Sequence, residues 1–284
     1  MITHIRRVLR RFPPLRALVH AYFRHKTQRA AAATAALTAG ELSMKWRLPA
    51  GAAPFAGRAP ANDLERYFAA NTGRQLDKWG HYFAVYERHF ARYRGTDVHV
   101  LEFGVSHGGS LQMWKEYFGP RAKIYGVDIN PACKSLEEDQ VEILIGDQGD
   151  RKFLRSLSGV VPRIDILIDD GGHTMWQQTA TFEEMFTHVA ADGVYLCEDL
   201  HTSYWKRFGG GYKRSGTFIE YSKNFIDVLH AWHVPPSRRL SVSPITRSVG
   251  SLHFYDSILV IEKEARQPPY HSETGHPSPN IAPP

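Results

Sequence analysis

VHVLEFGVSHGGS, residues 98–110, joins a short apolar run to a turn rich in glycine. Four similar apolar runs follow, each separated from the next by a helical pattern: AKIYGVDI (122–129), VEILIGD (141–147), IDILIDD (164–170) and GVYLCEDL (193–200). Five strands that alternate with helices predict a parallel sheet covered by helices on both faces.

The end of the chain departs from this alternation. A helical pattern near 216–232 is followed by SLHFYDSILVIEKE (251–264), which is typical of two strands joined by a tight turn. We therefore expect an α/β fold of the Rossmann-like type. Its doubly wound, mostly parallel sheet should have seven strands and end in an antiparallel C-terminal hairpin.

Composition predicts one domain with appendages, because 284 residues that are 43% hydrophobic can build one sizeable core. The expected parts are a basic leader (1–29), an Ala/Pro-rich linker (30–61), an N-terminal helical segment (62–96), the catalytic domain (97–264) and a disordered Pro-rich tail (265–284). Within the helical segment, apolar residues recur at steps of three and four from Leu76 to Tyr93 and predict an amphipathic helix packed on the core.

The net charge of +6 is concentrated in the leader. Residues 1–29 hold eight of the 35 Lys and Arg and no acid, so the remainder carries 27 bases against 29 acids. This distribution argues against a nucleic-acid partner. The leader lacks the apolar run of a signal peptide, and we expect a cytoplasmic protein whose leader either contacts an anionic membrane surface or, as we favour, is a solvated tail. Cys133 and Cys197 show no metal-type spacing, in keeping with a reducing compartment.

Polar residues follow the strands at the edge where such sheets bind ligands. The first turn carries Gly104 and Gly108, and Asp128 stands 24 residues beyond Gly104, where an acid would accept hydrogen bonds from ribose hydroxyls. The third turn reads GDQ (146–148). These turns predict a nucleoside ligand. Ser106 replaces the second glycine of a dinucleotide fingerprint, which together with the hairpin favours S-adenosylmethionine (SAM) over NAD.

Two pairs of adjacent acids end the fourth and fifth strands. Asp169 and Asp170 follow one, Glu198 and Asp199 the other, so all four should meet at the same edge. Like charges at close range need a cation, and Mg²⁺ prefers carboxylate oxygens. We expect Asp170, Glu198 and Asp199 to be the metal ligands and the side chain of Asp169 to point toward the cofactor. Capping of a loop is the alternative for any single acid.

His173 is the predicted general base, acting beside Asp170. A hydroxyl with a pKa of about 15.7 is too weak an acid for an imidazole with a pKa of about 6.5. Coordination to a metal lowers the pKa of the hydroxyl and removes most of this mismatch. The alternative is a surface histidine in a loop.

The run from LDKWGHYFAVYERHF through LEFGVSHGGSLQMWKEYFG, YGVDINP, GDQGD and IDDGGH to CEDLHTSYW resembles the metal-dependent sugar O-methyltransferases of class I. That group includes the mycinamicin 2''-O-methyltransferase and mycobacterial enzymes for mannosides and rhamnosides. The resemblance covers about residues 75–262. It implies Mg²⁺ on the acids matching Asp170, Glu198 and Asp199, and a base matching His173. The predicted cofactor contacts, several of them implied by the resemblance, are Glu102, Gly104, Ser106, Gly108, Ser110, Asp128, Asn130, Gly146, Asp147, Gln148 and Asp169.

The resulting hypothesis is transfer of the SAM methyl group to a hydroxyl of a sugar, a glycosylated natural product or a cell-wall saccharide, as in antibiotic or polysaccharide biosynthesis. Candidate contacts for the small-molecule or oligosaccharide acceptor are Lys78, His81, Tyr82, Tyr204 and Trp205. A homo-oligomer is left open. The rival classes are a nicotinamide-dependent oxidoreductase, an iron oxygenase with His201 as its second histidine, and a membrane-associated binding protein. The sequence departs from the family in reading DDGGH for the commoner DDGSH and in its N-terminal extension.

Overall fold

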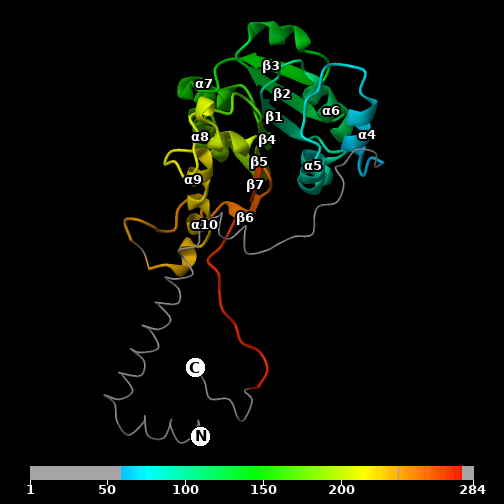
Figure 1. Ribbon diagram of the computed structural model, residues 1–284. Helices are drawn as coiled ribbons and strands as arrows, with labels where there is room; N and C mark the ends of the chain where they lie inside the picture. The colour runs from blue at the N-terminus through cyan, green and yellow to red at the C-terminus, as the bar shows by residue number, and fades with distance from the viewer. Residues whose placement is uncertain (1–58, 236, 277–284) are drawn as a thin grey trace, which may run out of the picture. The chain divides into compact units, whose positions relative to one another are not determined.

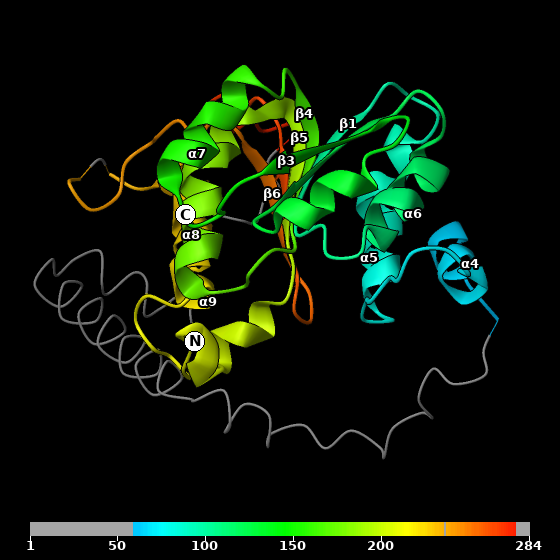
Figure 2. The same cartoon turned by 90° about the horizontal axis from the view of Figure 1, so that it is seen from above.

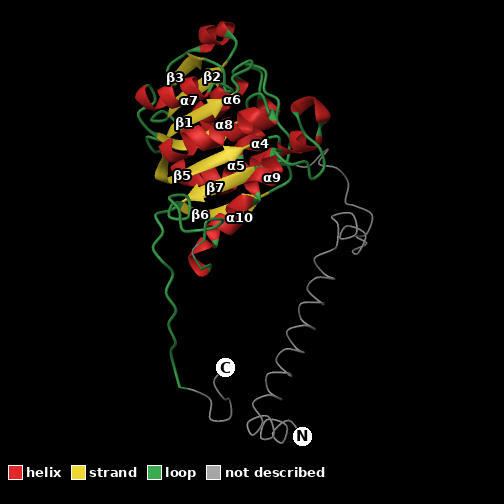
Figure 3. Cartoon of the chain, turned by 90° about the vertical axis from the view of Figure 1, so that its left-hand side faces the viewer, coloured by secondary structure: helices red, strands yellow, loops and turns green. Residues whose placement is uncertain are grey.

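The structure, a computed structural model, describes residues 59–235 and 237–276. The predicted leader, most of the linker and the last part of the tail lie outside the described residues. In the described part, seven strands form one sheet in the order β3-β2-β1-β4-β5-β7-β6 (Figure 3). Their bounds are His99–Phe103 (β1), Lys123–Asp128 (β2), Val141–Ile145 (β3), Ile164–Asp169 (β4), Val189–Cys197 (β5), Val249–Phe254 (β6) and Leu259–Lys263 (β7).

The pairing of the strands confirms the doubly wound sheet with an antiparallel end. Strands β1 to β5 are parallel, and β7 pairs antiparallel with both β5 and β6. In the register, Asp169 at the end of β4 lies beside Phe103 of β1 and Cys197 of β5. The residues that follow these three strands therefore leave the sheet at the same level.

Helices cover both faces of the sheet (Figures 1 and 2). One face carries α4 (Asp63–Ala70), α5 (Tyr82–Phe90) and α6 (Gly109–Phe118), and the other carries α7 (Arg151–Ser156), α8 (Met175–Met185), α9 (Phe218–Ser222) and α10 (Asn224–Leu229). Short 3₁₀ helices span Ala91–Tyr93, Pro131–Leu136, Leu157–Gly159, Phe186–His188, Leu200–Tyr204, Lys206–Phe208 and Ala231–His233. None of the helices in the described ranges has the length and apolar character needed to cross a membrane.

Alternate strand residues build two cores, one on each face. Val100 and Ile166 belong to the cluster that includes Trp114 of α6, whereas Leu101 and Leu167 belong to the cluster that includes Phe182 of α8. All of these side chains are buried. The nearly continuous apolar runs in the sequence thus reflect strands that are covered on both sides.

Two predicted helices were wrong in their bounds. The aromatic helix begins at Tyr82 rather than at Leu76, because the preceding residues form a loop that passes the start of α6. A Cβ on Gly109 would lie only 2.2 Å from the carbonyl oxygen of Gln75, so glycine at this position lets the two backbones touch. The helix predicted near 216–232 is broken at Lys223, whose carbonyl accepts from Ile226 in a tight i−3 bond.

Candidate functional site

A cavity of about 540 Å³ opens where the first, second, third and fourth strands end. It lies at the point where the chain order of the sheet reverses, between β1 and β4, which is where doubly wound sheets bind ligands. Seven of the predicted cofactor residues line it: Gly104, Ser106, Ser110, Asp128, Gly146, Asp147 and Gln148. Asp170, His173 and Asp199 line the same cavity.

The turn after β1 has an ordered shape that its hydrogen bonds explain. Asp128 Oδ2 accepts from the backbone N–H groups of Val105 and Ser106, each at 3.0 Å. Gly104 has φ +94°, and a Cβ there would lie 2.0 Å from the carbonyl oxygen of Asp170. Only glycine allows this close approach between the first and fourth turns. The cofactor side and the acidic side of the cavity are therefore in direct contact.

Four predicted cofactor residues do not reach the cavity lining. Glu102 is fully buried, accepts a 2.9 Å bond from Trp114 Nε1, and has a pKa that burial raises to about 7. Asp169 is fully buried as well, accepts from Gln148 Nε2 at 2.5 Å, and has a pKa raised by burial to about 6. Gly108 caps α6, and Asn130 caps the 3₁₀ helix at Pro131–Leu136. These four residues do not line the cavity but contact or cap the segments that form it.

Asp170, His173 and Asp199 converge at the acidic end of the cavity. Each offers one ligand atom, and these atoms lie within 4.8 Å of one another. His173 Nε2 is 3.5 Å from Asp199 Oδ2 and 3.8 Å from Asp170 Oδ1. His173 and Asp199 both have φ near 54°, a left-handed conformation that costs a non-glycine residue about 1–3 kcal/mol. Backbone strain is thus concentrated at two of the three converging residues.

Glu198, the third predicted metal ligand, lines a small cavity together with Asp170 and Asp199, and both of its carboxylate oxygens are hydrogen-bonded. Its Oε1 accepts a 2.7 Å bond from the Tyr86 hydroxyl, and its Oε2 accepts a 2.8 Å bond from Lys78 Nζ. Its side chain is only 1% exposed. Burial, reinforced by the charge of Asp170, raises the pKa of Glu198 well above its usual range.

Lys78, a predicted acceptor contact, lies beneath the acids and is among the lining residues of both the main cavity and the smaller cavity beside the acids. Its side chain is 2% exposed, and Nζ bonds to Asp170 as well as to Glu198, with Glu102 Oε1 at 3.8 Å. Burial would lower the pKa of Lys78, but the three carboxylates raise it well above the ordinary value. The ammonium is therefore a buried counter-ion.

The acids outnumber the positive charge that faces them. Glu102, Asp170, Glu198 and Asp199 surround one ammonium, and the raised pKa values of Glu102 and Glu198 reflect the cost of this crowding and burial. A second cavity of about 320 Å³ is lined by Asp170, Glu198 and Asp199. Carboxylate oxygens beside open space are a donor set that suits a hard divalent cation.

Two tyrosines of α5 complete the acidic end. Tyr82 is buried and donates a 2.7 Å bond to Asp199 Oδ1, so its hydroxyl orients an acid, whereas the sequence suggested an acceptor contact. Tyr86 was missed as a site residue because it belongs to the aromatic stripe that predicts core packing. The signal was present, since the stripe has tyrosine at both positions that face the acids.

A series of ring contacts runs from Trp79 through His201, Trp205 and Phe208 to His173. Trp79, 54% exposed, is 5.8 Å from the His201 ring, which lies 4.5 Å from Trp205. Phe208 lies 6.5 Å from His173. We call Trp79, His201, Trp205 and Phe208 the aromatic rim.

The remaining predicted acceptor residues lie nearby. Tyr204 is half exposed and lines a separate apolar cavity of about 430 Å³. His81 Nε2 bonds to the carbonyl of Asp256 at 3.1 Å.

Comparison with known proteins yields close relatives. No protein-family model matches the chain. It is 39% identical over 225 residues to 8-demethyl-8-alpha-L-rhamnosyl tetracenomycin-C 2'-O-methyltransferase of Streptomyces olivaceus, covering 71% of this chain and 59% of that protein. It is 36% identical over 209 residues to mycinamicin VI 2''-O-methyltransferase of Micromonospora griseorubida, covering 70% and 51%. The chain thus spans between half and three fifths of the length of these relatives.

A solved structure agrees with the sequence relatives. The MycE methyltransferase of the mycinamycin biosynthetic pathway, in complex with Mg and S-adenosylhomocysteine (SAH), matches with a TM-score of 0.64 and 34% identity, over 73% of this chain and 55% of that one. A further MycE complex also contains mycinamycin VI. Over the matched region, this chain is a homologue of the sugar O-methyltransferases and has the class I SAM-dependent methyltransferase fold.

Proposed function

We propose that this protein transfers the methyl group of SAM to a hydroxyl of a glycosylated small molecule or saccharide, with the help of a divalent cation. The observation that carries the proposal is the convergence of Asp170, Asp199 and His173 at one end of the cavity that the nucleoside-binding turns line. Donor, cation and base would then share one cavity.

The cofactor end of the cavity supports a nucleoside. Asp128 lines it: Oδ2 accepts from the backbone N–H groups of Val105 and Ser106, whereas Oδ1 accepts from the N–H of Asn130 and has a second lone pair left for a ligand. Ribose hydroxyls are suitable donors to such an acid. Asp147 and Gln148 line the adjoining wall, where they could contact the base or its sugar.

The acidic end fits a hard cation in its donor chemistry. Asp170 and Asp199 present oxygens to the cavity, while Lys78 and Tyr86 hold Glu198 beside them. We assign the first two as ligands and keep Glu198 as the third carboxylate of the set. Mg²⁺ commonly takes one or two carboxylates and completes its shell with substrate and water. Such a cation would lower the pKa of an acceptor hydroxyl.

His173 is placed to remove the proton of that hydroxyl. Its Nε2 faces both cavity acids, and Thr202 Oγ1 donates a 3.0 Å bond to its backbone carbonyl, which fixes the loop. The two nearby carboxylates would stabilise the imidazolium that forms. The deprotonated oxygen then attacks the methyl carbon of the sulfonium, and the S–C bond breaks to leave the thioether SAH. Alignment of the reacting atoms supplies much of the rate.

The aromatic rim supports an acceptor with a flat, partly apolar face. Trp79 and Trp205 are both substantially exposed, and Trp79 lines the smaller cavity that Asp170, Glu198 and Asp199 also line. Aromatic rings of this kind bury large contact areas at little entropic cost. Among the relatives, the names specify a rhamnosyl tetracenomycin-C and mycinamicin VI as acceptors. A glycoside is therefore the acceptor class we assign.

Transfer of labelled methyl from SAM to a panel of rhamnosides, mannosides and glycosylated polyketides tests the proposal. Turnover should require Mg²⁺ and stop in EDTA. The Asp170→Asn variant should lose both rate and metal dependence, whereas His173→Ala should lose rate and keep its affinity for SAH. His230→Ala, which removes an exposed imidazole after α10, is the matched control and should behave as the wild type.

Two results would contradict the proposal. Turnover that persists unchanged in EDTA would exclude the cation. Thermal stabilisation by NAD but not by SAH would instead favour an oxidoreductase on the same sheet. Flotation of the full chain with anionic vesicles, before and after removal of residues 1–29, separately tests the predicted membrane contact of the leader.

A further inference from the structure

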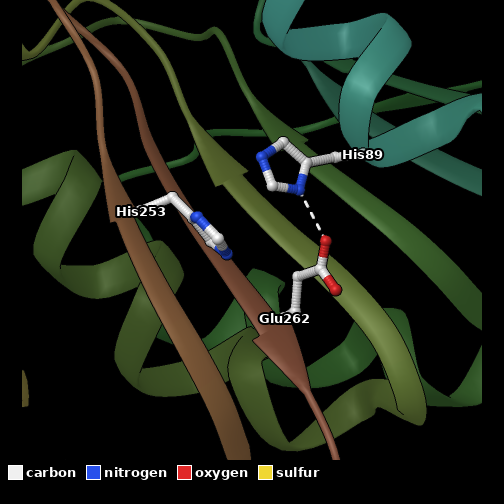
Figure 4. A group of neighbouring side chains, drawn as sticks. All are labelled: His89, His253 and Glu262. Carbon is white, nitrogen blue, oxygen red and sulfur yellow. Dashed lines mark hydrogen bonds and ion pairs between the residues drawn. The ribbon is translucent and has the colours of Figure 1, made fainter.

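Two histidines and a glutamate from three different elements meet on the face of the sheet that α5 covers. His89 comes from α5, His253 from β6 and Glu262 from β7 (Figure 4). Each offers one ligand atom, and these atoms lie within 4.8 Å of one another. His89 is 2% exposed, and the other two are half-buried. The group is therefore sheltered by the fold but reachable by an ion.

The donor set is that of a transition metal. Two imidazoles and one carboxylate suit zinc and its neighbours, which bind nitrogen at about 2.0–2.1 Å and carboxylate oxygen at about 2.0–2.2 Å. In a tetrahedral shell, ligand atoms at these distances are about 3.3 Å apart. The present ligand atoms, which lie within 4.8 Å of one another, have to approach this spacing, and the pair formed by His89 Nδ1 and Glu262 Oε1, now 2.5 Å apart, has to open. Rotations about the side-chain bonds would provide both changes.

The groups around the three side chains are those that orient metal ligands. His89 Nε2 lies 3.0 Å from the Tyr255 hydroxyl, and His253 Nε2 lies 2.9 Å from Ser251 Oγ. A ligating histidine usually bonds through its second ring nitrogen to such a partner. Arg92 Nη1 bonds to Glu262 Oε2 at 3.0 Å and leaves Oε1 directed at His89.

We propose that His89, His253 and Glu262 form a second metal site. The site binds a divalent transition-metal ion, with zinc as the preferred ion, and holds α5 against the C-terminal hairpin. Glu262 pairs with Val194 in the register of the sheet, four residues before Glu198. At about 3.3 Å per residue the two sites are about 13 Å apart. The ion at this site is structural and distinct from the cation beside Asp170.

Through His89, the proposed metal site is connected to the helix α5 that holds the acids of the cavity. Tyr82, Tyr86 and His89 are spaced at i, i+4 and i+7, so they lie on one face of the helix. Tyr82 and Tyr86 hold Asp199 and Glu198 through their hydroxyls. A metal at His89 would thus fix the far end of the helix that positions both acids.

The experiment measures zinc bound by the full-length protein after chelator treatment and dialysis against zinc with excess Mg²⁺. Elemental analysis should find about one zinc per chain that Mg²⁺ does not displace. Cobalt in its place should give the visible absorption of a four-coordinate ion. His253→Ala and Glu262→Gln should each weaken zinc binding at least tenfold, because each removes or neutralises a ligand. Zinc should raise the melting temperature of the wild type but not of these variants.

Two controls keep the outcome specific. His271→Ala removes an exposed imidazole elsewhere and should retain the zinc. Asp170→Asn should retain it too, because the sites are separate. The proposal is overturned if the wild type holds no zinc in the presence of Mg²⁺, or if His253→Ala and Glu262→Gln bind it as the wild type does. Either result would leave the three side chains as a hydrogen-bonded contact between helix and hairpin.

Discussion

Replacement of Lys78 by methionine tests how the acidic end of the cavity is held together. Methionine keeps most of the length of the side chain and removes the ammonium that now bonds to Asp170 and Glu198 and lies 3.8 Å from Glu102. The lysine side chain is 2% exposed, and methionine offers these carboxylates no donor in its place. The variant therefore leaves buried carboxylates without their counter-ion.

The expected loss is large. Removal of one partner from a buried ion pair destabilises a protein by about 3–5 kcal/mol. For a domain of this size that loss corresponds to a fall in melting temperature of about 6–20 °C. Part of the loss is avoided if Glu198, whose pKa burial already raises, takes up a proton. Added Mg²⁺ should restore more stability to Lys78→Met than to the wild type, because it replaces the missing charge.

Thermal and urea denaturation at pH 7.5, in EDTA and in Mg²⁺, measure both effects. Lys223→Met is the matched control, because Lys223 forms an exposed ion pair with Glu220 on the protein surface. Such a pair contributes at most about 1 kcal/mol. A Lys78→Met variant within about 1 kcal/mol of the wild type in EDTA would refute the reasoning. An equal shift by Mg²⁺ in both proteins would refute the link between the lysine and the cation site.

Three further outcomes follow from the same geometry. Tyr86→Phe keeps the ring but removes the hydrogen bond to Glu198. Urea denaturation should show that the free energy of unfolding falls by about 1.5–3 kcal/mol, and an unchanged free energy would mean that the hydroxyl does not stabilise the fold. Burial raises the pKa of Glu102 from 4.5 to about 7, so the folded protein holds a proton that the unfolded chain releases between these values. Stability in EDTA should therefore fall by about 3 kcal/mol as the pH rises through that window, and the fall should be smaller in Glu102→Gln; identical slopes would contradict the assignment. In Gly104→Ala, the added methyl group would meet the carbonyl oxygen of Asp170 and should displace this residue. Calorimetry should then show weaker SAH binding, and turnover should depend less on Mg²⁺. Unchanged values would show that the first turn can move freely.

The sheet was predictable because its strands are covered on both faces. Each strand then reads as an unbroken apolar run, and the acids and glycines that follow mark the edge where the strands end. The order of polar turns placed Asp128, Asp170 and His173 at one cavity without knowledge of a single contact. The antiparallel hairpin was visible for the same reason, as two runs with a short turn between them.

The path of residues 74–81 was not predictable from its pattern. Leu76 and Trp79 continue the helical spacing of α5, but the segment is a loop whose Gln75 backbone contacts Gly109, 34 positions away. That contact is tertiary, and periodicity reports only local structure. The loop places Lys78 under the acids, where its ammonium bonds to Asp170 and Glu198. The role of the lysine depends on this path and not on its neighbours in sequence.

Each acidic pair divides into a buried member and a presented one, a division that the sequence could not assign. Asp169 and Glu198 are essentially buried, with their pKa values raised by burial, whereas the side chains of Asp170 and Asp199 are 21% and 22% exposed and line the cavity. Gln148 bonds to Asp169, which holds the fourth turn in place. Lys78 bonds to both Asp170 and Glu198 and so keeps Glu198 beside the two presented carboxylates. A cation at this end would therefore meet Asp170 and Asp199 directly, with Glu198 held next to them in the lining of the smaller cavity.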